Sequence, residues 1–169
     1  MFSYTSHMKL LYNMSCSQPH ARLYQLEDGR FQIVGEGGLA PLMIGYEYVL
    51  VEEHFALYLT TLDLPKMKII DAIIYEPWQK KEIRTHKQLL IDQQFSSDMI
   101  QNIDQPNSPD IVQREIDLDG EQFLLMDRQY VFVSAALRER LDASGSVTFA
   151  SQRGLVSSQQ KHNTRLPLA

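Results

Sequence analysis

The feature that most constrains this chain is a strand-then-helix pattern that occurs twice. Val49–Leu59 and Val131–Leu141 each begin with alternating β-branched residues and continue with apolar residues four apart. This change of hydrophobic period, from two to about 3.6, predicts a strand that leads directly into an amphipathic helix. When the two copies are aligned, their apolar positions coincide: Val49 with Val131, Val51 with Val133, Phe55 with Leu137, and Leu59 with Leu141.

Each copy is followed by a second apolar segment, Met67–Tyr75 after the first and Val147–Ala150 after the second. Two explanations fit this similarity: an internal strand–helix–strand repeat, or two independent solutions to burying one face of a sheet. The first helix is expected over Glu52–Leu62. The second is expected to begin after an N-cap at Ser134 and to end near Ala143.

Two Asp-Gly dipeptides predict tight type I′ hairpins, because both central residues of that turn need a positive φ angle. The expected hairpins are Arg22–Glu27 with Arg30–Val34, around Asp28-Gly29, and Ile111–Leu118 with Gln122–Met126, around Asp119-Gly120.

Two further strands are expected in the middle of the chain. Met67–Tyr75 is apolar on both faces, which is typical of a central strand covered on both sides. In Ile83–Ile91 the polar residues Arg84, His86 and Gln88 alternate with apolar ones, which predicts one solvated face. Shorter elements are expected as follows: a strand at Lys9–Tyr12, a loop at Asn13–His20, a helix at Ser96–Ile103 and a loop at Pro106–Pro109.

These elements predict a single α+β domain over residues 1–154. We expect a mostly antiparallel sheet of about six to eight strands with two main helices packed on it. Residues 155–169 are polar and unpatterned, so we expect a disordered tail there.

The composition argues against several classes of protein. The net charge of −5 disfavours nucleic-acid binding, which needs clustered Lys and Arg. Cys16 is the only cysteine, so the chain has no intrachain disulfide, and a reducing cytoplasmic compartment is expected. No apolar run approaches the roughly 20 residues of a membrane helix, and Met1–His7 lack the pattern of a signal peptide.

Motifs that hold cofactors or metals are incomplete in this sequence. Gly35–Gly38 lacks the Lys-Ser/Thr of a phosphate-binding loop. Asp117–Gly120 lacks the distal glutamate of a calcium loop, and no two of the five histidines lie four apart. We therefore expect no cofactor, no metal ion and no catalytic residues.

Candidate partner-binding residues come from one aromatic and several acidic side chains. Trp78 lies in a loop between two expected strands, where tryptophan serves either as an interface anchor or, the interpretation we favour, as a cover for the core. The acidic residues near the second hairpin would face a basic partner or, again the favoured interpretation, protect a sheet edge. The candidate surface comprises Glu52, Glu53, Trp78, Asp117, Asp119 and Glu121.

The second strand–helix copy and the residues that follow it carry a resemblance to a known family. Tyr130–Ser134, Leu137, Leu141, Gly145 and Val147–Phe149 provide a short strand ending in a small residue, a helix, a glycine and a closing strand. In this order they resemble the C-terminal half of a divergent family of immunity proteins from bacterial polymorphic toxin systems. The first copy is similar to a strand–helix unit in the first half of such proteins. The chain departs from the family pattern by one extra residue between the glycine and the closing phenylalanine.

This resemblance implies a cytoplasmic protein that neutralises a cognate toxin by stoichiometric binding and carries no catalytic residues. The acidic candidate surface would suit a basic enzyme toxin. Two other functions fit the sequence. One is a small enzyme whose site is assembled from Cys16, or from His54 and His86, only in the fold. The other is a structural or adaptor domain that self-associates through an uncovered sheet edge.

Overall fold

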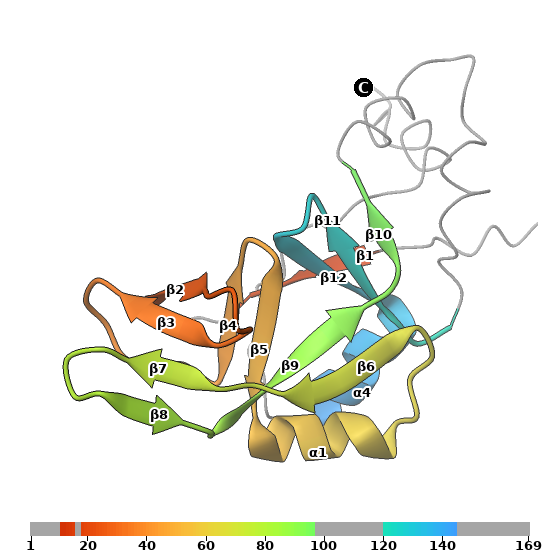
Figure 1. Cartoon of the computed structure of the whole chain (residues 1–169). Coiled ribbons are helices and arrows are strands. Elements are labelled where there is room, and N and C mark those ends of the chain that lie inside the picture. The colour runs from red at the N-terminus through yellow and green to blue at the C-terminus, as the bar shows by residue number, and fades with distance from the viewer. Residues whose placement is uncertain (1–10, 16–17, 97–119, 145–169) are drawn as a thin grey trace, which may run out of the picture.

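The computed structural model describes residues 11–15, 18–96 and 120–144. In that part of the chain, twelve strands and two helices form an α+β structure in which antiparallel pairing dominates, so the expected fold class is confirmed. The strands belong to three four-stranded sheets rather than to one (Figure 1).

Sheet C lies at the centre of the molecule, and all of its strands pair antiparallel (Figure 1). Helix α1 runs along its lower side in this view. In spatial order the strands are β4 (Leu42–Gly45), β5 (Tyr48–Glu52), β9 (His86–Ile91) and β6 (Met67–Asp71), and α1 spans Glu53–Thr61.

Sheets A and B lie on either side of sheet C. Sheet A, with helix α4 (Ala135–Ser144) packed on it, has the order β1 (Leu11–Met14), β12 (Tyr130–Ser134), β11 (Phe123–Met126) and β10 (Gln94–Phe95). Sheet B has the order β2 (Arg22–Gln25), β3 (Phe31–Val34), β7 (Ile74–Glu76) and β8 (Lys81–Ile83). Each of these sheets contains one parallel pair, β10 with β11 and β3 with β7.

Strand β5 separates two hydrophobic cores, because its side chains alternate between the faces of sheet C. Val49 and Val51 belong to the larger core, which sheets A and C share with both helices. Tyr48 and Leu50 belong to the smaller core between sheets B and C. Strand β5 thus links the two cores, because one of its faces packs in each of them.

The strand–helix copies meet in the larger core. All of the aligned positions are buried there: Val49, Val51, Phe55 and Leu59 from the first copy, and Val131, Val133, Leu137 and Leu141 from the second. The helices also contact directly, since the Tyr58 hydroxyl donates a hydrogen bond to the Arg140 carbonyl at 2.9 Å. The strand-then-helix prediction is confirmed in both copies, whereas Val147–Ala150 lies outside the described residues.

Ser134 is the N-cap of α4, as the sequence predicts. Its Oγ accepts hydrogen bonds from the backbone N–H of Leu137 at 3.3 Å and of Gln122 at 3.1 Å, and the residue is buried. Replacing Ser134 with alanine leaves both donors without this acceptor, so we expect a loss of about 1–3 kcal/mol in the free energy of unfolding. Urea unfolding of Ser134→Ala beside Thr61→Ala, which removes an exposed hydroxyl, measures this cost; equal midpoints would contradict it.

The apolar segment Met67–Tyr75 is two strands, and its prediction as one covered central strand is wrong. The chain leaves β6 at the end of sheet C and enters β7 in sheet B. Strand β6 is an edge strand, and Ile70 on it is 41% exposed because sheet B does not cover this part of sheet C. An apolar sequence does not specify what covers it.

The predicted strand Ile83–Ile91 is likewise divided, between β8 and β9, and its face with His86 and Gln88 is buried instead of solvated. His86 is tolerated there because both ring nitrogens are hydrogen-bonded. Nε2 donates to the Ala40 carbonyl at 2.8 Å, and Nδ1 lies 2.8 Å from the Thr85 hydroxyl.

The Asp28-Gly29 hairpin is confirmed, but its turn is not type I′. The Leu26 amide donates to the Arg30 carbonyl at 2.8 Å, which leaves a three-residue loop in which only Gly29 has a positive φ (89°). The Asp28 carboxylate stabilises this loop by accepting a hydrogen bond from the Arg30 amide at 3.0 Å. This is the longer hairpin form, in which a type I turn is followed by a left-handed residue.

Other predictions differ in part or fall outside the described residues. Strand β1 extends to Met14, so Asn13 and Met14 are not in a loop. Strand β11 forms a hairpin with β12. The predictions outside the described residues are the strand Ile111–Leu118, the helix from residue 97 to Ile103, the loop Pro106–Pro109 and the tail 155–169.

Candidate functional site

The turn between β4 and β5 is built around one glycine. Gly45 pairs with Tyr48 across the hairpin, and the Tyr48 ring lies over Gly45 so closely that a Cβ atom there would overlap the ring. An aromatic ring that covers a strand glycine replaces the missing side-chain contact. Only glycine therefore fits beneath this ring.

Tyr48 connects the turn to the edge of sheet B. The residue is 7% exposed, and its ring packs edge-on against Phe31 with centroids 5.6 Å apart. Its hydroxyl accepts a hydrogen bond from the Leu23 amide at 3.4 Å. Burial raises the pKa of Tyr48, with the Leu23 bond acting in the opposite direction.

This raised pKa predicts a loss of stability at alkaline pH. An unfolded tyrosine ionises near pH about 10, whereas the folded Tyr48 holds its proton to higher pH. The free energy of unfolding therefore falls as the pH rises from about 10 through the folded pKa. Chemical unfolding between about pH 9 and 11 should show a smaller decline in the free energy of unfolding for Tyr48→Phe than for the wild type. Equal dependence of this free energy on pH in the two proteins would contradict the prediction.

A groove of about 870 Å³, here called the tyrosine groove, lies between β2 and the β4–β5 turn. One wall is formed by residues Arg22–Leu26 and the other by Ile44–Tyr48. Tyr24 and Tyr46, one from each wall, are 65% and 62% exposed. The groove therefore presents two aromatic side chains to solvent.

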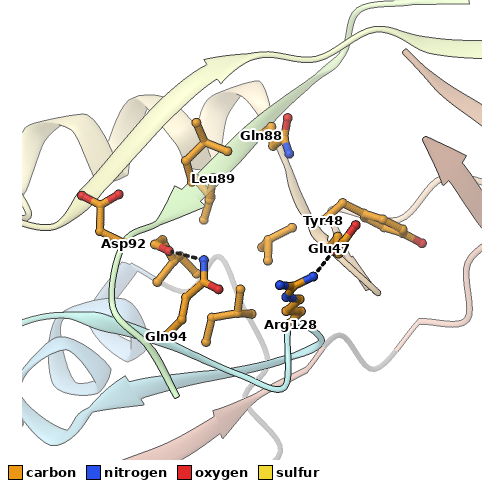
Figure 2. Close-up of a pocket in the computed structure, with 11 residues that line it drawn as sticks. Glu47, Tyr48, Gln88, Leu89, Asp92, Gln94 and Arg128 are labelled. Carbon is orange, nitrogen blue, oxygen red and sulfur yellow. Dashed lines mark hydrogen bonds and ion pairs between the residues drawn. The ribbon is translucent and has the colours of Figure 1, made fainter. Parts of the chain in front are cut away.

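A second groove, of about 510 Å³, lies on the other side of the same turn and is called the amide groove (Figure 2). Glu47 and Arg128 close one end of it: their side chains are 2.7 Å apart, and the Glu47 amide donates to the Arg128 carbonyl at 2.7 Å. Both residues hold left-handed backbones, with φ of 66° and 59°. Hydrogen bonds to Glu47 and Tyr46 raise the pKa of Arg128.

Gln88 gives the amide groove its polar character. It lies between Leu50 and Ile70 in sheet C and is only 8% exposed. Within the part of the chain that the structure describes, its carboxamide has no hydrogen-bond partner, and it lines the groove with Gln94 (Figure 2). The polar atoms of this amide still reach solvent, so the groove offers a donor and an acceptor to a ligand.

The acidic residues that the sequence proposed as a surface lie apart. Glu52 ends β5, with a carboxylate oxygen 3.3 Å from His54, and the neighbouring Glu53 is exposed at the start of α1. Glu121 pairs with Arg140 at 2.8 Å and lies beside Leu62–Lys66, the segment that follows α1. Glu121 is therefore near the opposite end of the helix from Glu52 and Glu53. Asp117 and Asp119 lie outside the described residues.

The remaining candidates are also separated. Trp78 is 70% exposed in the turn between β7 and β8, so its interpretation as a core cover is wrong. His54 is exposed whereas His86 is buried with both nitrogens engaged, and Cys16 lies outside the described residues. Trp78, His54 and His86 line neither groove.

The residues that line the grooves carry little signal in the sequence. Tyr24 alternates with buried Leu23, and this alternation indicates an outward side chain without indicating a groove. Gln88 in β9 and Arg128 in the turn between β11 and β12 are brought to one site although they are far apart in the chain. No local pattern predicts such a meeting.

No protein-family model, no curated protein and no solved structure matched the chain. Neither helix of the described segments is long and apolar enough to cross a bilayer. Within the same segments, no group of three or more His, Cys, Asp or Glu residues could hold a metal ion.

Proposed function

We propose that this protein is a cytoplasmic immunity protein that neutralises a cognate bacterial toxin by stoichiometric binding. The tyrosine groove is the centre of its binding surface in this proposal. The observation that carries the proposal is the exposure of Tyr24 and Tyr46 on opposite walls of one groove. Tyrosine is enriched at the energetic centres of protein interfaces, because its rigid ring buries a large area and its hydroxyl finds a polar partner.

The charge of the chain supports a basic partner. The net charge of −5 would increase the rate of association with a cationic protein by electrostatic steering. The Glu47–Arg128 ion pair beside the groove adds a polar rim, which is typical of specific interfaces.

A tagged pull-down from the native host, followed by mass spectrometry, tests the proposal. We expect one stoichiometric partner, a protein containing a domain that kills cells when expressed alone and that this chain neutralises when co-expressed. Failure to bind under conditions where such a toxin is expressed, or binding without protection of the cells, would count against the proposal.

The tyrosines give this test a residue-level prediction. Tyr24→Ala and Tyr46→Ala are each expected to weaken binding to the recovered partner by about 5–30-fold, which corresponds to about 1–2 kcal/mol. Tyr130→Ala is the matched control, since Tyr130 is 45% exposed but lines neither groove. Calorimetric titration of the three variants measures the difference; equal affinities would place the binding surface elsewhere.

A further inference from the structure

Strand β2 is an outer strand of sheet B. The direction in which its N–H and C=O groups point follows from its pairing with β3. Gln25 is paired with Phe31 in the β2–β3 ladder. The Phe31 amide, however, donates to the Ile73 carbonyl at 2.8 Å, so the backbone of Phe31 faces away from β2. In an antiparallel ladder such a pair exchanges no hydrogen bonds, and the N–H and C=O of Gln25 therefore point away from β3.

Two hydrogen bonds confirm this direction and show where the free edge begins. The amides of Ala21 and Leu23 point in the same direction as the amide of Gln25. The Ala21 amide donates to the Gly38 carbonyl at 2.9 Å, and the Leu23 amide donates to the Tyr48 hydroxyl at 3.4 Å. The next groups along the edge are the Leu23 carbonyl and the amide and carbonyl of Gln25. These three have no partner in the described part of the chain, and both residues line the tyrosine groove.

We infer that the tyrosine groove accepts an extended segment of the partner protein as an added strand on β2. The inference rests on the proposed function, since it takes that partner to be the toxin. An extended backbone presents alternating N–H and C=O groups, which complement the free groups of Leu23 and Gln25. Tyr24 and Tyr46 line the groove in which the alternate side chains of the added strand lie.

The two ends of the edge limit the register and the sequence of the added strand. At one end, the Tyr48 hydroxyl occupies the Leu23 amide and stops further pairing toward Ala21. At the other end, the exposed carboxylate of Glu27 lines the groove and forms no ion pair with any residue in the described ranges. The segment is therefore one with β-branched or aromatic residues at alternate positions and a Lys or Arg beside Glu27.

The test compares two substitutions at Gln25. Gln25→Pro removes the edge N–H, and an edge strand tolerates proline where that N–H faces solvent. Gln25→Ala removes the side chain and keeps the N–H. The probes are the partner recovered by the pull-down and peptides selected from a displayed random library on the purified wild-type protein.

We expect Gln25→Pro to weaken binding by at least about tenfold and Gln25→Ala to change it by less than about threefold. Equal binding by the two variants would overturn the inference. Hydrogen exchange of the wild type provides a readout that does not depend on the folding of the proline variant. The Gln25 amide is expected to exchange rapidly in the free protein and slowly in the complex; no added protection would overturn strand addition.

The two proposals fail in different ways. A toxin that binds both Gln25 variants equally leaves the proposed function in place and removes strand addition. Peptides that require the Gln25 amide, together with a host partner that is not a toxin, support strand addition and remove the immunity function. A dimer in light scattering that becomes monomeric in Gln25→Pro would identify the occupant as a second copy of this chain and overturn the assignment to a partner.

Discussion

Replacement of Phe55 by alanine is expected to lower the free energy of unfolding by about 3–5 kcal/mol, the usual cost of removing a buried phenylalanine. Phe55 is 2% exposed in the core that both helices share, and its ring stacks on Tyr58 with centroids 6.5 Å apart. The cavity would lie between α1 and sheet C, where strands paired on both sides restrict collapse around it.

Urea unfolding of Phe55→Ala beside Leu57→Ala measures this effect. Leu57 is on the same helix but is 63% exposed, so its replacement should change the stability by no more than about 0.5 kcal/mol. Leu137→Ala, at the aligned position of the second copy, should also destabilise strongly. The double variant should deviate from additivity because both residues belong to one core. Equal midpoints for Phe55→Ala and Leu57→Ala would contradict the shared core.

Replacement of Gly45 by alanine is expected to cost about 2–4 kcal/mol and to weaken partner binding as well. The new Cβ would overlap the Tyr48 ring, which is enclosed in the core between sheets B and C and therefore cannot move away freely. Displacing the ring loses its contact with Phe31 and its hydrogen bond from Leu23. Because this turn is a wall of both grooves, both would change shape.

Gly38→Ala is the matched control, since a Cβ there meets nothing within 4 Å and Gly38 has no positive φ. Its stability should remain within about 1 kcal/mol of the wild type. Thermal unfolding and partner titration of both variants provide the comparison. Equal stability and equal partner affinity of Gly45→Ala and Gly38→Ala would show that the Tyr48 ring can move aside.

The sequence by itself determined the elements whose signals are local. The strand–helix copies were recognisable because the hydrophobic period changes at Glu52 and at Ser134, within one short segment each time. The Ser134 cap was recognisable because its hydroxyl binds an amide three residues later. The Asp28-Gly29 hairpin was found for the same reason, although the loop length that selects the turn type depends on how β2 and β3 pair.

Only the tertiary structure decided which elements cover one another. The sequence predicts Met67–Tyr75 as one covered strand, because an apolar residue gives the same pattern whether its face is covered, as at Ala72, or open, as at Ile70. His86 was expected in solvent, because the carbonyl of Ala40 that makes its burial tolerable is distant in sequence. The grooves were not predicted, since their walls come from separate strands and two turns. Local periodicity fixes which residues form strands and helices, whereas covered faces, free edges and grooves depend on contacts between distant segments.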